Sequence, residues 1–244
     1  MEYIDNVALA DILHLLEKAD INIEGLVPWG SNYTFLVSIC RETVAAQGIY
    51  KPRRGERPLW DFPAGTLCHR ERAAFLVSQT IGWDIVPPTV LRQGPQGYGS
   101  LQYFIDHDPD QHYFTLKGQF EEQTQKIVLF DILINNADRK GGHVILDRQN
   151  QLWAIDHGIC FHVDHKLRTV IWDFAGTLIP SKLLQDMQQL QAILTQKESE
   201  LTIALRELLS KGELKALQTR LQHLIDIAHF PEPGPGRHYP WPLV

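Results

Sequence analysis

A change of hydrophobic pattern near residue 106 constrains the fold of this chain more than any other feature. Residues 33–50 and 89–105 are rich in apolar and β-branched side chains broken by turn residues, a pattern typical of antiparallel strands. Residues 106–112 are polar and contain Pro109, as a connection between folded units often does. Farther along, apolar residues recur mainly at helical spacing. We therefore expect an α+β fold with two lobes, made of residues 1–105 and 106–230, and a proline-rich extended tail over residues 231–244.

The first of these parts reads as a small antiparallel sheet with two helices. Residues 5–19 predict an amphipathic helix capped by Asp5 or Asn6, and residues 67–81 predict a second helix that ends at Gly82. The predicted strands lie near residue 26 and over residues 33–40, 43–50, 89–92 and 101–105.

The second part reads as helices around one hairpin. A helix over residues 121–135 precedes two short strands over 144–146 and 152–155, joined by a turn. Three more helices follow, with leucines that we interpret as plain core. Their predicted caps are Ser181, the capping box Thr195-x-x-Glu198 and the capping box Ser210-x-x-Glu213, with Gly212 between the last two helices. We expect Tyr239 and Trp241 to pin the tail to the surface.

Charge and cysteine content narrow the classes of partner and compartment. The chain has 23 Lys and Arg against 29 Asp and Glu, a net charge of −6, so no global positive field attracts nucleic acid or an anionic membrane. Its three cysteines form no Cys-x-x-Cys pair, which favours a reducing cytoplasm. The most apolar segment, residues 127–134, is short and carries Asp131, so we expect no integral membrane association. The acidic start shows no export signal.

Two aspartates carry the strongest chemical signal. Asp138 lies in the segment Asn135–His143, directly after a predicted helix, and Asp156 ends the predicted hairpin, followed by His157 and Gly158. Two carboxylates held at the ends of elements, one beside an Arg-Lys pair, suit phosphoryl transfer, which depends on positioning and on charge neutralisation around magnesium and a triphosphate. Asp138 would accept the proton of the acceptor, and Asp156 would hold Mg²⁺. Taken alone, both could equally be structural turn residues.

The strand and helix residues upstream supply groups that could bind phosphate. Lys51 ends a predicted strand, and Glu71 on the following helix could hold its amine inward. Gly30, Ser31 and Asn32 could offer backbone N–H groups to phosphates, although such a turn is a weak signal. The sequence contains no G-x-x-x-x-G-K-[ST], which excludes a Walker-type site.

The order of these features resembles the protein-kinase-like superfamily: a glycine-containing turn, Lys51, Glu71, Asp138-x-Lys140 and Asp156-His157-Gly158. The details are most similar to its phosphatidylinositol 3-/4-kinase-like branch and, over nearly the whole chain, to the SCO1664-type bacterial group. That broader likeness includes residues 51–56, 60–66, 136–143 and 239–242.

The resemblance implies a bilobal fold that binds ATP with Mg²⁺ in the cleft between the lobes. It implies that Lys51 contacts the α- and β-phosphates, that Glu71 braces it, and that Asp138 is the catalytic base and Asp156 a metal ligand. Lys140 corresponds to the lysine that meets the γ-phosphate in protein kinases, and we place Arg139 with it in the catalytic group. The hinge that binds the nucleotide base would lie at Gln102, Tyr103 and Phe104.

One departure from the kinase pattern affects the metal site. His143 stands five residues after Asp138, where kinases carry an Asn that binds a second metal ion. Imidazole suits Mn²⁺ or Zn²⁺ better than Mg²⁺, so Mn²⁺ is an alternative cofactor. The enzyme would be a phosphotransferase whose activity His143 makes uncertain. The alternatives are a pseudokinase that binds nucleotide as a regulatory module and, less favoured, a metallohydrolase built from His143, His157, His162 and His165 with Asp156 and Asp164.

The acceptor is not identified by the sequence. Residues 159–180 would be the equivalent of the activation loop, where lipid kinases place basic residues against inositol phosphates. Only His165, Lys166 and Arg168 are candidates here, and they fit a solvated turn better, so a phosphoinositide substrate is not supported. A protein side chain or a small molecule remains the expected acceptor. The basic cluster of Arg53, Arg54 and Arg57 could grip a nucleotide or simply keep a loop soluble.

Overall fold

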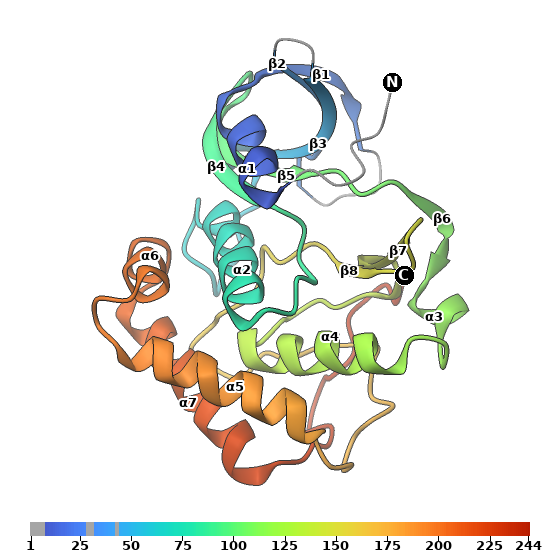
Figure 1. Ribbon diagram of the computed structural model, residues 1–244, viewed down its shortest axis with the longest axis vertical. Helices are drawn as coiled ribbons and strands as arrows, with labels where there is room; N and C mark the ends of the chain where they lie inside the picture. Colours follow the sequence, from blue (N-terminus) through green and yellow to red (C-terminus); the bar gives the residue numbers. More distant parts are fainter. Residues whose placement is uncertain (1–7, 28–31, 42–43) are drawn as a thin grey trace.

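Two lobes lie one above the other in the computed structural model, which describes residues 8–27, 32–41 and 44–244 (Figure 1). The upper lobe holds a five-stranded antiparallel sheet in the order β1-β2-β3-β5-β4. Its register places Lys51 of β3 opposite Ser100 of β5. The strands are β1 (Asp20–Leu26), β2 (Phe35–Arg41), β3 (Val44–Pro52), β4 (Thr89–Gly94) and β5 (Gly97–Tyr103). The expected sheet is thus confirmed.

Helix α1 (Leu9–Lys18) covers one face of this sheet. Alternating apolar residues on the strands, such as Val37 and Ile39, point to this face and pack with Leu16 of the helix. The helix begins after Ala8, four residues later than the sequence pattern suggested, and the predicted caps Asp5 and Asn6 lie outside the described residues.

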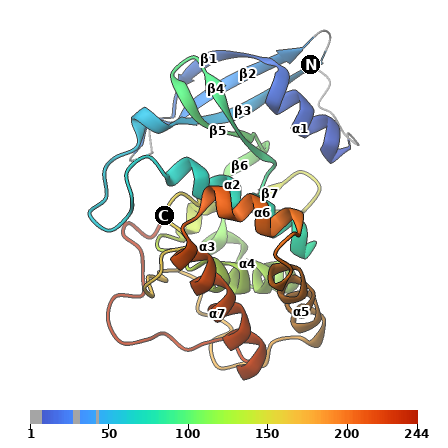
Figure 2. The same ribbon diagram turned by 90° about the vertical axis from the view of Figure 1, so that its left-hand side faces the viewer.

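Helix α2 (Leu67–Ile81) has the bounds that the sequence predicts. It ends at Gly82, whose φ of +74° is in the left-handed region that glycine adopts without strain. Although α2 belongs to the N-terminal half of the sequence, its apolar residues are part of the large core of the lower lobe. The helix packs against α5 (Ser181–Thr195) and α6 (Glu200–Leu208) (Figure 2).

The lower lobe combines helices with a three-stranded sheet in the order β6-β7-β8. Its leucines are core residues as expected, with Leu190, Leu205, Leu217 and Leu221 fully buried. A short helix, α3, was not predicted. The elements are β6 (His107–His112), α3 (Tyr113–Leu116), α4 (Glu121–Ile134), β7 (Val144–Asp147), β8 (Leu152–Ala154) and α7 (Lys211–Ile227), besides the 3₁₀ turn η2 (Gly141–His143). A further 3₁₀ turn, η1 (Arg53–Gly55), follows β3 in the upper lobe.

Three local predictions need correction. The polar segment near residue 107 is not a free connection, because it forms the edge strand β6 paired with β7. Thr195 does not cap a helix: it is the last residue of α5, and the hydroxyl of Ser199 accepts the N–H of Thr202 to cap α6. Ser181 is likewise the first residue of α5 without a side-chain cap bond.

The capping box of Ser210 and Glu213 at the start of α7 is confirmed. Gly212 lies inside the first turn of this helix rather than between helices.

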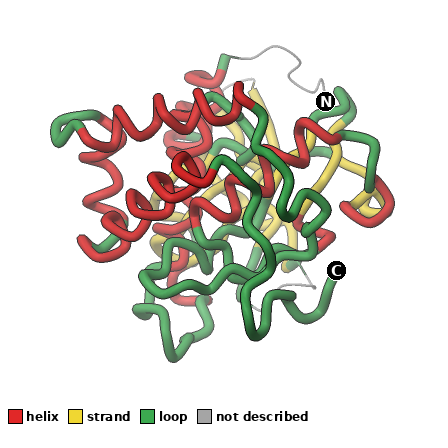
Figure 3. Tube along the Cα trace, turned by 90° about the horizontal axis from the view of Figure 1, so that it is seen from below, coloured by secondary structure: helices red, strands yellow, loops and turns green. Residues whose placement is uncertain are grey.

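The segment 231–244 contains no helix or strand and runs along the lower lobe (Figure 3). Backbone hydrogen bonds hold it: Thr169 donates to the carbonyl of His238 at 3.1 Å, and Gly141 donates to that of Leu243 at 2.7 Å. Of the two side chains that we expected to pin the tail, Tyr239 is 45% exposed and Trp241 76% exposed, so neither is buried against the lobe. Within the described ranges, no helix is long and apolar enough to cross a bilayer.

Candidate active site

A cleft of about 410 Å³ opens between the sheet and the β7–β8 hairpin. Its roof comes from β2, β3 and β5, and its floor from η2, β7 and the segment after β8. Apolar side chains such as Ile49, Ile145 and Ile155 line its inner part, and Lys51, Glu71, His143 and Asp156 line its polar end. The cleft therefore has an apolar section beside a charged one, as a nucleotide base and its phosphates require.

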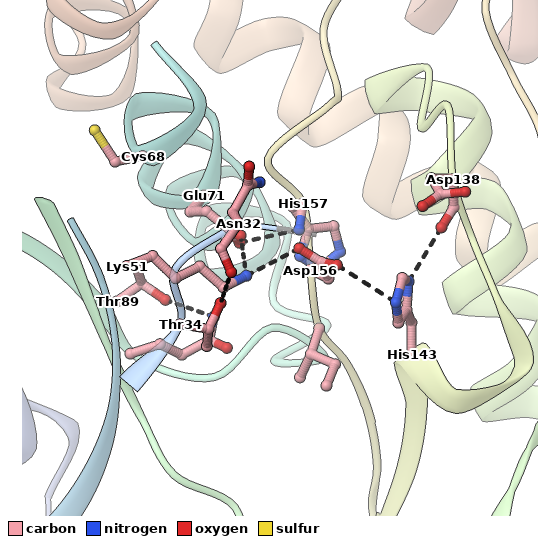
Figure 4. Close-up of polar contacts among 12 residues, drawn as sticks. Asn32, Thr34, Lys51, Cys68, Glu71, Thr89, Asp138, His143, Asp156 and His157 are labelled. Atoms are coloured by element: carbon pink, nitrogen blue, oxygen red, sulfur yellow. Dashed lines mark hydrogen bonds and ion pairs between the residues drawn. The ribbon is translucent and has the colours of Figure 1, made fainter. Parts of the chain in front are cut away.

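Lys51 connects the two lobes at the polar end (Figure 4). Its amine forms an ion pair with the buried carboxylate of Glu71 on α2 and lies 2.9 Å from Oδ1 of Asp156. Burial lowers the pKa of Lys51, but the charges of Asp156 and Glu71 outweigh it and hold the pKa above its usual value. The amine is therefore a fixed positive charge that faces the cleft.

Glu71 also fixes the segment that carries Asp156. Its second oxygen, Oε2, accepts the backbone N–H of His157 at 2.9 Å. Asp156 itself has a φ of +61°, a left-handed conformation that few non-glycine residues adopt and that is often found at functional sites. The positive charge of Lys51 holds the pKa of the Asp156 carboxyl well below its usual range, although burial opposes this shift. Its side chain is 49% exposed, so a charged carboxylate is presented to the cleft.

His143 stands on the other side of Asp156 in a defined protonation state. Its Nδ1 lies 3.1 Å from the backbone carbonyl of Asp138, which can only accept a hydrogen bond, so Nδ1 carries the proton. Burial, together with nearby Arg139, lowers the pKa of His143 to about 4 despite the charge of Asp156. The bare Nε2 then faces Oδ2 of Asp156 at 3.4 Å.

Two lone pairs that face each other without a proton between them fit a cation. Carboxylate oxygen and neutral imidazole are both ligands for divalent metals, and the carbonyl bonded to Nδ1 is the partner that orients metal-binding histidines. His143 and Asp156 are therefore a chemically suitable pair of metal ligands.

Asp138 lies beyond His143 on the same side of the cleft (Figure 4). Burial raises the pKa of its carboxyl to about 6, with a further contribution from the charge of Asp156, while Lys140 and Arg139 partly oppose the rise. The amine of Lys140 lies 3.2 Å from Oδ2 of Asp138, and both side chains are partly exposed. A carboxylate with this pKa can accept a proton near neutral pH.

Arg139 is placed differently from its two neighbours. Its side chain is completely buried and forms a two-point ion pair with Asp131 of α4, at 2.7 Å and 2.9 Å. It also donates to the carbonyls of His143 and Ile155. This geometry suits a residue that positions the segment 135–143 against the β7–β8 hairpin rather than one that touches a substrate.

The expected base-binding residues line the cleft. Gln102 and Tyr103 are the last residues of β5, and Phe104 follows the strand at the inner wall of the cleft. The N–H groups of Tyr103 and Phe104 already donate to the carbonyls of Pro88 and Gln47, so these two donors are not free for a base. The amide of Gln102 donates to the hydroxyl of Thr89.

Of the predicted phosphate-binding turn, only Asn32 lies within the described residues. Its side chain accepts the N–H of Arg57 at 2.7 Å, and the residue lines the cleft. Gly30 and Ser31 lie outside the described residues.

The histidines do not converge on one point. His162 contacts the carbonyl of Asp61, and His157 is buried against Arg139. In the described parts of the chain, no three His, Cys, Asp or Glu side chains are grouped as metal ligands, which leaves the metallohydrolase interpretation without a site. Lys166, one of the basic candidates, is paired with Asp61 at 2.9 Å.

Sequence reasoning missed the part of Asp131 in this site. Its signal was a single acidic residue inside the apolar run of residues 127–134, since a buried carboxylate needs a buried partner. The apolar walls of the cleft were predicted only as strand residues, because periodicity does not tell a cleft wall from core.

Comparison with known proteins finds similarity to kinases over most of the chain. The family model described as phosphatidylinositol 3- and 4-kinase matches residues 24–213. Protein Rv2133c of Mycobacterium tuberculosis is 36% identical over 266 aligned residues, which cover 93% of this chain and 94% of that protein. Phosphatidylinositol 4-kinase gamma 4 of Oryza sativa is 30% identical over 110 residues, which cover 37% of this chain but only 20% of the rice protein.

A solved structure shares the fold at low sequence identity. The Golgi casein kinase superposes with a TM-score of 0.58 at 17% identity, covering 92% of this chain and 75% of that one. Its form with Mn/ADP bound has a TM-score of 0.54 at 16% identity, covering 89% and 74%. These likenesses confirm the bilobal kinase-like fold expected from the sequence.

Proposed function

The chain belongs to the phosphatidylinositol 3- and 4-kinase family, and from this membership we propose that it is an ATP-dependent phosphotransferase acting on a protein side chain or a small molecule. One observation carries the proposal: Lys51 reaches both Glu71 and Asp156, although Lys51 and Asp156 are 105 positions apart in the sequence. An amine, its acidic brace and an exposed carboxylate in one cleft are the groups that phosphoryl transfer needs.

In this proposal each side chain at the polar end has one task. Lys51, held by Glu71, binds phosphate oxygens. Asp138 takes the proton of the acceptor hydroxyl as that oxygen bonds to the γ-phosphorus and the bond to the β-phosphate oxygen breaks, which releases ADP. Lys140, beside Asp138, neutralises charge on the transferred group.

The metal ion in this proposal is Mg²⁺ or Mn²⁺, held by Asp156 and His143. When bound, it would neutralise charge on the triphosphate. The Mn/ADP complex of the similarly folded Golgi casein kinase supports a nucleotide and a divalent ion as cofactors. The imidazole of His143 favours Mn²⁺ over Mg²⁺.

In this proposal the nucleotide lies between the two lobes. We place the boundary at residues 105 and 106, since β5 ends the upper sheet at Tyr103 and β6 begins the lower one at His107. The base would then lie between the wall at Gln102–Phe104 and the floor at Ile145 and Ile155.

A cytoplasmic location fits the unpaired cysteines, of which Cys68 and Cys160 are buried.

A pseudokinase is the second candidate, and His143 is the observation that favours it. Neutral imidazole is a poorer ligand for Mg²⁺ than the Asn of active kinases, so the chain could bind nucleotide without transferring phosphate.

Labelled ATP separates the two candidates. Purified protein would be incubated with γ-labelled ATP, Mg²⁺ or Mn²⁺ and an acceptor mixture, beside the Asp138→Asn variant. We expect transfer or ATP turnover in the wild type and its loss in the variant, while nucleotide binding persists in both. Nucleotide binding without turnover in either metal would instead establish the pseudokinase.

A further inference from the structure

Arg70, the residue before Glu71 on α2, is a buried cation with distant partners. Its side chain is 1% exposed and donates at 2.6 Å to the carbonyl of Cys160 and at 2.6 Å to Oε1 of Glu213 on α7. Its guanidinium also lies over the ring of Phe62, 4.8 Å from the ring centre. Successive residues of a helix point about 100° apart. Glu71 can therefore face the cleft while Arg70 faces the helices of the lower lobe.

Glu213 is a fixed partner for this cation. One of its oxygens binds Arg70, and the other accepts the backbone N–H of Ser210 at 2.8 Å within the capping box of α7. The residue is 6% exposed. Burial raises the pKa of its carboxyl, but the Ser210 N–H and the charge of Arg70 outweigh this and keep the group charged.

The packing of α2 also attaches this helix to the lower lobe. The helix shares the lower core with α5 and α6, and Figure 2 shows it close to α6, above the other helices of that lobe. The helix also contacts β4 and β5 of the sheet, so it connects the packing of the lower lobe to the sheet that carries Lys51.

We propose that Arg70 and Glu213 are positioning residues that hold Glu71 against Lys51, so that the lower lobe sets the phosphate-binding lysine in place. This inference rests on the proposed function for its catalytic meaning. Glu213, a capping residue at the start of α7, would then help to set the affinity for the nucleotide phosphates, although it is far in sequence from the residues of the cleft.

A double-mutant cycle tests whether Arg70 acts through Glu71. The affinity for ADP with Mn²⁺ would be measured by calorimetry in the wild type, Arg70→Met, Glu71→Gln and the double variant. We expect each single variant to bind about tenfold more weakly, the loss of one hydrogen bond to a charged group. The double variant should lose little more than Glu71→Gln alone, since the two residues act on the same lysine. Losses that multiply would overturn the inference, because they would mean that Arg70 acts independently of Glu71.

Ser210→Ala is the matched control. It removes the hydroxyl that accepts the N–H of Glu213 and weakens the same helix end, but it leaves the carboxylate of Glu213 on Arg70. We expect a lower melting temperature with unchanged ADP affinity. If ADP binding in this control falls as much as in Arg70→Met, the role of the pair is only structural.

A readout without nucleotide separates this inference from the proposed function. Hydrogen exchange of residues 67–81 should accelerate in Arg70→Met and stay slow in Ser210→Ala. Should Arg70→Met fail to fold because Glu213 is left as an unpaired buried charge, Arg70→Met combined with Glu213→Gln replaces it. If α2 of Arg70→Met exchanges faster but the wild type binds no nucleotide, the proposed function is refuted and the positioning role of Arg70 and Glu213 still holds. If exchange in α2 is unchanged while nucleotide binding is intact, that positioning role is refuted and the proposed function still holds.

Discussion

Replacing Asp131 by asparagine should destabilise the fold strongly, because it leaves the buried charge of Arg139 without a partner. Asp131 is 1% exposed and Arg139 is completely buried. Two hydrogen bonds, of 2.7 Å and 2.9 Å, join their side chains, and Asn136 donates a third to Asp131 at 2.9 Å. Asparagine has almost the same shape, so packing is kept, but the charge is lost and one acceptor oxygen becomes an NH₂ donor that faces a donor N–H. Removing one partner of a buried ion pair costs about 3–5 kcal/mol.

Urea denaturation measures this loss directly, and thermal unfolding should show a melting temperature lower by about 10 °C for a chain of this size. The control is Glu122→Gln on the same helix. Glu122 pairs with Lys126 at 3.4 Å, but its side chain is 79% exposed, so we expect a change below about 0.5 kcal/mol. If Asp131→Asn loses less than about 1 kcal/mol, the buried pair does not hold the segment 135–143 in place.

Three further predictions concern the metal, the base and the core. His143→Asn should raise the rate with Mg²⁺ relative to Mn²⁺ in a turnover assay, since an amide oxygen replaces imidazole; an unchanged metal preference would mean that residue 143 does not bind the ion. The rate should fall about tenfold per pH unit below about pH 6, where the half-buried Asp138 carboxyl becomes protonated. Lys140→Met should move this limb to higher pH, because the lysine opposes the raised pKa, and a limb that stays in place would remove Asp138 as the base. Leu217→Ala should lower the free energy of unfolding by about 2–5 kcal/mol in urea, as Leu217 is fully buried, whereas the exposed Ile203→Ala should cost far less.

The sequence predicted the elements that local signals define. Helix α2 was placed to the residue because Gly82 supplies a left-handed end, and the capping box of Ser210 and Glu213 marks the start of α7. Thr195 misled because its spacing to Glu198 imitates a capping box, while the actual cap, Ser199, lacks an acidic residue three positions later. Strand β6 was missed because its hydrogen bonds to β7 involve the backbone, which leaves no pattern in polar side chains.

For the candidate site, order along the chain was more informative than periodicity. The expected convergence of Lys51, Glu71 and Asp156 agrees with the contacts in the structure. The contacts that hold them could not be read from the sequence, because Arg70 and Glu213 are 143 residues apart, and the capping box that contains Glu213 does not indicate a distant partner. Long-range pairs of this kind depend on how the two lobes pack.

The most direct test of the account is the binding of ADP with Mn²⁺ to the wild type and to Lys51→Met, measured by calorimetry. If the phosphates bind in the cleft between the lobes, the wild type should bind one nucleotide, and Lys51→Met should bind at least about tenfold more weakly. The melting temperature of Lys51→Met should also fall, because the buried Glu71 loses its charged partner, so affinity is compared at a temperature where both proteins are folded. Equal affinity in the two proteins, or no binding by a folded wild type, would contradict the account.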